Sequence, residues 1–352
     1  MNRVISLINI IIISLIINSC QYPVDLTELP DTQQFIVIDA ELTETYGSVN
    51  VNYSLTEIDA KGGYNFPTPP NASAYVLDSK GNRTDFKSNG EINFGFKGVI
   101  GETYKLYITV DGQSYESTAE TMRACPELDT VSVFYTRESG RIPDDLNYDG
   151  FDVYAELTDI AGEENFYEWD WIHYEKAASC NIIMENNQEV RVPCFPSECW
   201  DITYNRRIIV QADKLRDGEP IAHKVVRVPY ATPPNKYYLR VEQRAITPTV
   251  FEYLKSLETQ TQNIGSQFDI PAQTQFSPNI YNVNNPSEKI IGVFSVFSSR
   301  YKVIYIDMLQ EIPNARAKFI GTTLPFTSDP FASFPCVEGK YRTKIKPEGW
   351  ID

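Results

Sequence analysis

Apolar and polar residues alternate with a period of two in several short runs near the start of this chain. The clearest run covers residues 103–110, where every second residue from Tyr104 to Val110 is apolar. Successive side chains of a strand point to opposite faces, so such a run predicts a strand with one buried face. Similar runs lie within residues 34–44, 48–57, 72–87, 90–96 and 101–120. Asp111-Gly112 is a strong hairpin signal inside the last of them.

Short strands at these intervals predict a β-sandwich of immunoglobulin-like kind over residues 35–122. This stretch is also similar to the prealbumin-like regulatory domains that are attached to carboxypeptidases and transporters. Pro126 ends one β-run, and residues 123–352 predict a second, larger and mostly β domain. A content of 22 Tyr, 18 Phe and 22 Pro against 4 Met agrees with β-structure better than with a helical bundle.

The larger domain is predicted to contain strands and one amphipathic helix. Residues 151–159 and 165–175 are typical of two paired strands around a turn. The helix is expected near residues 248–262, because Thr247 can cap it and Pro248 suits the first helical turn. Its apolar face is formed by Val250, Phe251, Leu254 and Leu257.

The first nineteen residues have the features of a secretory signal peptide. Arg3 supplies a positive start, and the apolar run Val4–Ile17 is too short to span a bilayer. The residues that follow, Ile17-Asn18-Ser19-Cys20, resemble a bacterial lipobox, in which the chain is cut before a cysteine that becomes lipidated. We therefore expect a lipid anchor on Cys20, a polar tether over residues 20–34 and a location outside the cytoplasm. Glutamine rather than aspartate after Cys20 favours the outer membrane. The sequence does not determine which leaflet of that membrane holds the anchor.

The charge of the chain limits its partners. It carries 31 Lys and Arg against 47 Asp and Glu, a formal net charge of −16. An acidic chain repels phosphate backbones, and no basic stripe occurs in the sequence, so we expect no nucleic-acid partner. Solubility alone is a sufficient reason for the acidity.

The cysteines are predicted to be structural. Disulfides form and persist beyond the inner membrane, so the cysteines other than Cys20 are expected to form bridges rather than to bind a metal. The candidates, with the connectivity open, are Cys180, Cys194, Cys199 and Cys336. Cys125 stands alone at the predicted domain boundary and is the expected odd thiol. Reduction is expected to loosen residues 177–200 and to leave the N-terminal sandwich folded.

Recognised catalytic signatures are missing from the sequence. It has two histidines and lacks H-E-x-x-H, G-x-S-x-G and the phosphate-binding pattern G-x-x-x-x-G-K-[ST]. The acidic pairs Asp144-Asp145 and Glu163-Glu164 stand in loop-like stretches, where solvated charge is the simpler interpretation. Residues 144–150 are rich in oxygen ligands but lack the spacing of a calcium-binding EF-hand loop. We predict no enzymatic activity, no cofactor and no metal site, and leave calcium binding as an open question.

Three aromatic residues, Tyr167, Trp169 and Trp171, share one face of a predicted strand. Such a stripe has two interpretations. It either fills the core of a sheet or, when exposed, forms a platform on which a glycan or peptide stacks. The sequence favours the core and leaves the platform as a candidate ligand site.

Six segments of the chain resemble one family. They are the lipobox at Cys20 and residues 35–43, 101–117, 248–260, 279–296 and 335–350. Together they resemble a family of Bacteroidota lipoproteins known as domain of unknown function 4249. Cys194, Cys199 and Trp200 look like the central cysteine-tryptophan segment of that family, whereas Gly339 stands near the place where relatives often have a second cysteine.

The resemblance implies a cell-envelope role without naming an activity. Members of the family tend to be encoded near TonB-dependent outer-membrane transporters, which implies an accessory subunit or a substrate-capturing lid. The leading hypothesis is therefore a non-enzymatic lipoprotein beside a β-barrel transporter. A stand-alone glycan- or peptide-binding module is the alternative, and a carboxylate-dependent envelope hydrolase is the third.

Overall fold

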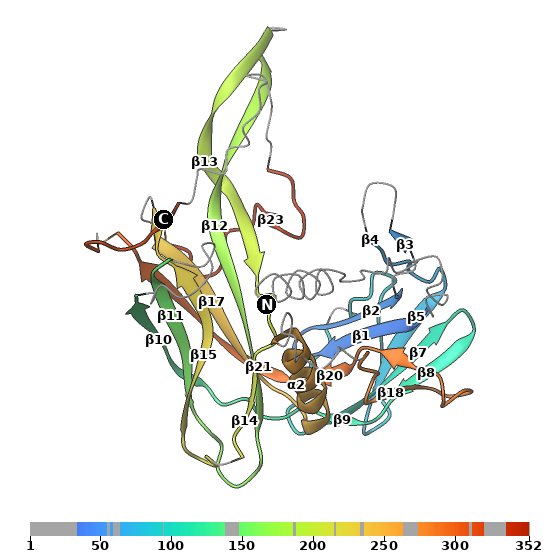
Figure 1. Cartoon of the computed structure of the whole chain (residues 1–352). Helices are drawn as coiled ribbons and strands as arrows, with labels where there is room; N and C mark the ends of the chain where they lie inside the picture. Colours follow the sequence, from blue (N-terminus) through green and yellow to red (C-terminus); the bar gives the residue numbers. More distant parts are fainter. Residues whose placement is uncertain are drawn as a thin grey trace, which may run out of the picture.

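The computed structural model describes residues 34–54, 57–58, 64–93, 95–137, 148–185, 188–214, 216–232, 236–262, 274–309, 312–319 and 336–351. For residues 57–58, 64–65, 178–197 and 319 it describes the backbone alone. Over these residues the fold is mainly β, with two sandwiches side by side and one helix, α2, between them (Figure 1).

The first sandwich consists of two sheets that share one apolar core. One sheet contains β1 (Ile36–Leu42), β2 (Gly47–Tyr53), β19 (Ile290–Ile291) and β20 (Phe294–Val296). The other contains β5 (Ala72–Asp78), β6 (Arg83–Asp85), β7 (Thr103–Val110), β8 (Gln113–Ser117), β9 (Glu120–Thr121) and β18 (Ile280–Asn282). The core between them includes the fully buried Ile38, Leu42, Leu106 and Phe294.

The predicted alternation is confirmed in β7. Its alternate residues Tyr104, Leu106, Ile108 and Val110 are all at most 3% exposed. The hairpin signal after it is confirmed as well, because β7 pairs with β8 across Asp111-Gly112. Both turn residues have positive φ, 47° and 82°, which is the backbone form that a two-residue hairpin of this kind requires.

The first sandwich also takes strands from late in the chain, which differs from the predicted division at residue 123. β19 and β20 pair in parallel with β1, and β18 pairs with β8. Residues 280–296 therefore belong to the N-terminal sandwich, although about 160 residues separate them from it. Runs of two or three residues carry too little periodicity to show which sheet they join.

The second sandwich packs a small sheet against a large one. The small sheet contains β10 (Leu128–Thr136), β11 (Gly150–Thr158) and β15 (Pro220–Pro229). The large sheet contains β12 (Phe166–Glu185), β13 (Gln188–Tyr204), β14 (Val210–Ala212), β17 (Lys236–Ala245), β21 (Ser298–Asp307) and β23 (Arg342–Thr343). Two short pairs complete the strands: β3 (Glu57–Ile58) with β4 (Tyr64–Asn65), and β16 (Ala231–Thr232) with β22 (Lys318–Phe319).

The predicted pairing of residues 151–159 with residues 165–175 is wrong. These residues form β11 and the start of β12, which lie in opposite sheets of the second sandwich. β11 pairs with β10 and β15, whereas β12 pairs with β13, β14 and β17. Both runs turn their apolar residues into the same core, and periodicity identifies that face without identifying the neighbouring strand.

The predicted helix is confirmed as α2 (Pro248–Gln262). Thr247 caps it, since the N–H of Val250 donates to Thr247 Oγ1 at 3.5 Å and the N–H of Phe251 to the Thr247 carbonyl at 2.9 Å. Val250 and Phe251 are buried in a small third core with Phe166, Ile246 and Phe297. The helix thus covers the end of the large sheet beside the first sandwich.

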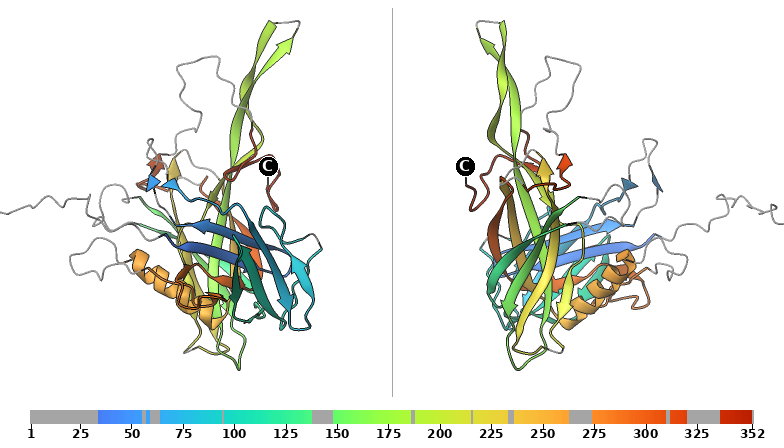
Figure 2. Two further views of the ribbon diagram at one scale, coloured as in Figure 1. Left: turned by 90° about the vertical axis from the view of Figure 1, so that its right-hand side faces the viewer. Right: turned by 60° about the vertical axis from the view of Figure 1, so that its left-hand side comes forward.

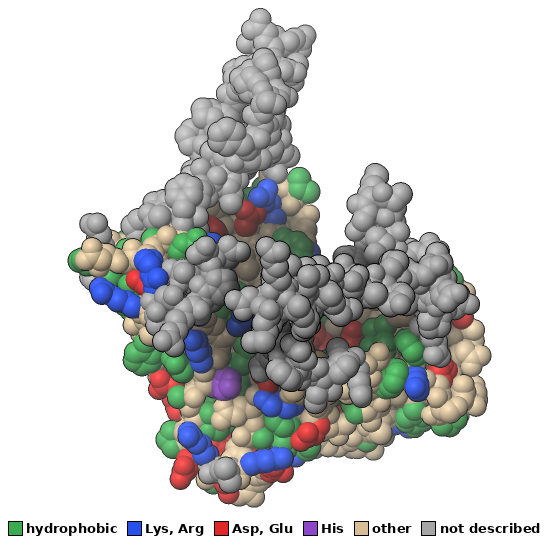
Figure 3. All heavy atoms as spheres, viewed as in Figure 1, with side chains coloured by type: hydrophobic (Ala, Val, Ile, Leu, Met, Phe, Trp, Pro, Cys, Tyr) green, Lys and Arg blue, Asp and Glu red, His purple; other side chains and the backbone are tan. Residues whose placement is uncertain are grey.

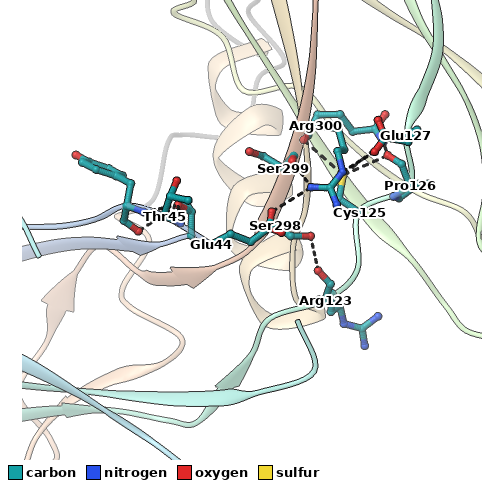
Figure 4. Close-up of polar contacts among 12 residues, drawn as sticks. Glu44, Thr45, Arg123, Cys125, Pro126, Glu127, Ser298, Ser299 and Arg300 are labelled. Carbon is teal, nitrogen blue, oxygen red and sulfur yellow. Dashed lines mark hydrogen bonds and ion pairs between the residues drawn. The ribbon is translucent and has the colours of Figure 1, made fainter. Parts of the chain in front are cut away.

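The chain passes from the first sandwich to the second near residue 123, returns after α2, and passes to the second again near residue 297. A polar cluster joins the first and the last of these crossings (Figure 4). Arg300 of β21 forms ion pairs with Glu44 of the first sandwich at 3.1 Å and with Glu127 at 2.8 Å. Ser298 Oγ donates to the carbonyl of Arg123 at 2.6 Å. These partly exposed ion pairs link the two sandwiches and contribute modestly to stability.

Candidate functional site

The two longest strands form a hairpin that extends beyond the large sheet. β12 leaves its neighbour β17 after Ile172, yet its pairing with β13 continues to Glu185↔Gln188. Figures 1 and 2 show this hairpin projecting well away from both sandwiches. We call residues 178–185 and 188–197 the arm.

The two halves of the arm pair only with each other within the described part of the chain. The pairs that β12 and β13 form with β14, β17 and β23 all lie nearer the sandwich. Register shifts occur between Lys176 and Ala178 and between Ser179 and Asn181, and irregularities of this type bend and twist a ladder. An isolated two-stranded hairpin is marginally stable in water, and its free N–H and C=O groups can accept another strand. A hairpin of this form can therefore accept an added strand along an edge.

The base of the arm is firmly held. A disulfide joins Cys199 of β13 to Cys336, and Trp200 beside it is 0% exposed. Trp200 packs edge-on against Trp350 near the end of the chain, with 6.0 Å between ring centroids. Arg342 of β23 makes two hydrogen bonds to the Asp201 carboxylate, at 2.6 and 3.1 Å. The C-terminal segment thus fastens the arm to the second sandwich.

The structure accounts for three of the six cysteines. Cys199 and Cys336 are bridged, and Cys125 is a buried free thiol, in agreement with its expected role as the odd cysteine. Burial raises the pKa of Cys125 to about 11, against the opposing effect of a hydrogen bond from Gln243, so this thiol stays protonated at neutral pH. Cys20 and the side chains of Cys180 and Cys194 lie outside the described residues, as do Asp144 and Asp145.

The proposed aromatic platform is wrong for Tyr167 and Trp169, because both are in the core. They are 0% and 1% exposed, and Trp171 is partly buried against the same cluster. Trp169 stacks on His223 with 4.6 Å between ring centroids and donates from Nε1 to Gln243 Oε1 at 3.2 Å. These rings face the small sheet, so no ligand can reach the faces of Tyr167 and Trp169.

Both histidines have structural surroundings. His173 is 7% exposed, stacks on Tyr237 at 3.7 Å between ring centroids, and places Nδ1 2.7 Å from the carbonyl of Tyr238. A carbonyl only accepts, so the proton of the neutral ring is on Nδ1. Burial lowers the pKa of His173 to about 4, against the opposing effect of that carbonyl.

His173 is expected to make the protein less stable in mild acid. Its folded-state pKa lies below the unfolded value of about 6.5, so the unfolded chain binds the extra proton first as the pH falls through this range. Between about pH 7.5 and about pH 4.5 the free energy of unfolding should fall by about 2 to 3 kcal/mol on this account. Urea unfolding of the wild type and of His173→Gln at both pH values measures it. An equal pH dependence in the two proteins would contradict this role.

A pocket lies where the first sandwich, α2 and the large sheet meet. Its volume is about 280 Å³, and we call it the junction pocket. Its lining comes from β1, β2, β12, β17, α2 and the β19–β20 segment, and includes Glu41, Asn50, Glu168, Arg244, Leu254, Ser295 and Phe297. It is therefore assembled from residues as distant in the sequence as Asp39 and Phe297.

Arg244 is the electrostatic centre of the junction pocket. Its guanidinium forms ion pairs with Glu168 at 3.6 Å, Asp170 at 3.1 Å and Glu242 at 3.5 Å. Burial alone would lower the pKa of Arg244, but the carboxylates around it outweigh this effect and raise it. Burial also raises the pKa of the Glu168 and Asp39 carboxyl groups.

The pocket offers hydrogen-bonding groups beside an apolar wall. Arg244 Nε and Ser295 Oγ are buried and find no hydrogen-bond partner among the described residues. Leu254, Val250 and Phe297 supply the apolar side. Three carboxylates around one guanidinium give an excess of negative charge, so the site suits a small hydroxyl-rich or amine-bearing molecule better than an anion.

Neither the arm nor the junction pocket was predicted from the sequence. Glu168 and Asp170 occupy the polar positions that alternate with Tyr167 and Trp169. Acidic residues at such positions ordinarily predict a face turned to solvent, so the alternation gave no local signal of the pocket. The other lining residues share no spacing that could have connected them.

On the face drawn in Figure 3, acidic and basic side chains are interspersed over the described part. No helix in the described ranges is both long and apolar enough to cross a bilayer.

The comparisons with known proteins identify a family for this chain and name no activity. No curated protein matches the chain. The family described as domain of unknown function (DUF4249) matches residues 21–302, which is most of the sequence, and the chain therefore belongs to the DUF4249 family.

Proposed function

We propose that this protein is a non-enzymatic, lipid-anchored accessory subunit of the cell envelope that binds a TonB-dependent outer-membrane transporter through the arm. The observation that carries the proposal is the arm itself, a two-stranded hairpin that extends beyond the large sheet and has no third strand at either edge among the described residues. The signal peptide and lipobox at Cys20 support an outer-membrane location, with the leaflet open, and the family resemblance supports the kind of partner.

The arm suits a β-rich partner for a physical reason. Its unpaired N–H and C=O groups give regularly spaced hydrogen bonds to an added strand, and such strand addition provides affinity through the main chain. The base, fastened by Cys199–Cys336 and by the Arg342–Asp201 pair, keeps the hairpin aligned with the second sandwich. Docking at the arm would therefore set the orientation of both sandwiches beside the partner.

Replacing residues 178–197 by an Asn-Gly turn that joins Ala177 to Glu198 tests this role. The lipidated, tagged protein is purified from native membranes in mild detergent, and the proteins recovered with it are identified by mass spectrometry. We expect a stoichiometric β-barrel transporter with the wild type and its loss with the shortened arm. Phe134→Ala, which removes an exposed ring of β10, is the matched surface control and should retain the barrel.

The outcomes of this purification distinguish a transporter subunit from a stand-alone binding module. Recovery of the barrel with the shortened arm would refute docking through the arm. Recovery of the wild type alone would favour the second candidate, a stand-alone glycan- or peptide-binding module. The junction pocket is the observation that favours that candidate, and glycan and peptide arrays would then be compared between the wild type and Ser295→Val.

A further inference from the structure

Two loops meet at the end of the second sandwich opposite the arm. One loop, residues 159–165, joins β11 to β12, and the other, described over residues 213–214 and 216–219, joins β14 to β15. Their backbones are connected, since the N–H of Asp213 donates to the carbonyl of Asn165 at 3.1 Å and the N–H of Asp159 to the carbonyl of Glu219 at 3.2 Å. The two loops therefore form one structural unit.

Three aspartates from these loops converge. Asp159, Asp213 and Asp217 each place a carboxylate oxygen within 4.8 Å of the corresponding oxygens of the other two. Asp159 is 5% exposed and Asp213 is 3% exposed, while Asp217 lies at the open side. Charges of the same sign at such distances repel one another strongly where water is excluded.

The surrounding groups satisfy two of the three carboxylates. Asp159 accepts hydrogen bonds from the Tyr167 hydroxyl at Oδ1 and from the N–H of Gly218 at Oδ2, 2.9 Å away. Asp217 Oδ1 accepts from the N–H of Gly162 at 2.7 Å. The nearby Lys214 side chain is directed to Glu164 and Glu252, at 3.9 and 4.0 Å.

Asp213 is the exception. Its Oδ2 atom is buried and accepts no hydrogen bond within the described part of the chain. Burial raises the pKa of Asp213, as do the Asp159 and Asp217 carboxylates, whereas the N–H of Asn165 lowers it. A buried carboxylate oxygen without a donor, facing two further carboxylates, lacks a positive partner.

We propose that Asp159, Asp213 and Asp217 bind a Ca²⁺ ion that joins the β11–β12 loop to the β14–β15 loop. The donors are all oxygen atoms, which hard cations prefer, and zinc would select histidine or cysteine instead. Ca²⁺ accepts six to eight oxygen ligands in irregular arrangements, so loop carbonyls and water can complete three carboxylates. Mg²⁺ demands near-octahedral geometry at shorter distances, which two irregular loops satisfy less readily.

Calcium titration of the mature protein tests the site. After treatment with EDTA, isothermal titration calorimetry should show one Ca²⁺ bound per chain, and millimolar Ca²⁺ should raise the melting temperature, because the ion binds the folded state alone. Asp213→Asn should lose both effects. Asp85→Asn, the same change at a half-exposed residue of the first sandwich, should keep them.

The melting temperature of Asp213→Asn without calcium shows whether this variant is folded. In EDTA, Asp213→Asn removes one of three repelling charges, so it should melt at or above the temperature of the wild type. Terbium offers a second readout, because Tyr167 donates directly to Asp159 and should sensitise Tb³⁺ emission that Ca²⁺ then quenches by displacement. A wild type that binds neither ion, or a folded Asp213→Asn that retains the calcium response, would overturn the proposal.

Discussion

Trp169→Ala is expected to lower the free energy of unfolding by about 3 to 5 kcal/mol, as large-to-small substitutions of buried aromatic residues do. Trp169 is 1% exposed at the centre of the second sandwich, so its loss leaves a cavity between the two sheets. The truncation also removes the hydrogen-bond donor of Gln243 Oε1, and Gln243 is 0% exposed. A buried acceptor that loses its donor costs about 1 to 3 kcal/mol in desolvation, and this cost is part of the expected loss.

Chemical denaturation followed by far-UV circular dichroism measures this effect. Phe134→Ala is a suitable control, because Phe134 is an aromatic residue of the same sandwich with 56% of its surface exposed. The control should change the free energy of unfolding by less than about 1 kcal/mol. Similar losses in the two variants would show that Trp169 does not pack as described.

Removing the disulfide is expected to lower the free energy of unfolding by about as much as Trp169→Ala does. Cys199 and Cys336 are separated by 137 residues, and in the chain-entropy model a bridge closing so long a loop contributes about 5 kcal/mol. Measured values commonly fall below the model, so we expect a loss of about 3 to 5 kcal/mol for the double variant Cys199→Ala/Cys336→Ala. The bridged segment also carries the Arg342–Asp201 pair and Trp350, whose ring packs against Trp200.

The loss should begin locally. Hydrogen exchange of the double variant should show reduced protection in residues 336–351 and at the base of the arm, with β1, β5 and β7 of the first sandwich still protected. Limited proteolysis should show the same order of loosening. Equal loss of protection in both sandwiches would contradict this expectation. It would show that the disulfide stabilises the whole chain evenly and not the base of the arm first.

The elements that were predicted correctly carry their signal in a few neighbouring residues. The strand from Thr103 to Val110 shows its buried face through simple alternation, and the turn at Asp111-Gly112 requires two residues that tolerate positive φ. Helix α2 begins where a capping threonine precedes a proline. Each of these depends on local backbone geometry, which adjacent side chains set directly.

Strand partners were predicted poorly for an equally physical reason. Hydrogen bonds between strands join backbone groups that are the same in nearly every residue, so the residues of β11 do not state that β10 and β15 are its neighbours. The same holds for β18–β20, which return to the first sandwich, and for the length of the β12–β13 hairpin beyond the large sheet.

The candidate sites depend on that pairing. Arg244 meets Glu168 and Ser295 because three segments far apart in the chain are brought together, and Asp159 meets Asp213 because two loops share one end of a sandwich. Residue types and local spacing were thus sufficient for the mainly β class, the helix and the isolated thiol, and the lipid anchor on Cys20 stays a prediction. The folded structure alone determined four features: the arm, the junction pocket, the Cys199–Cys336 bridge and the aspartate cluster. They depend on contacts between residues far apart in the sequence. The energies of such contacts come from packing and desolvation in the assembled fold, which no short stretch of the chain can specify.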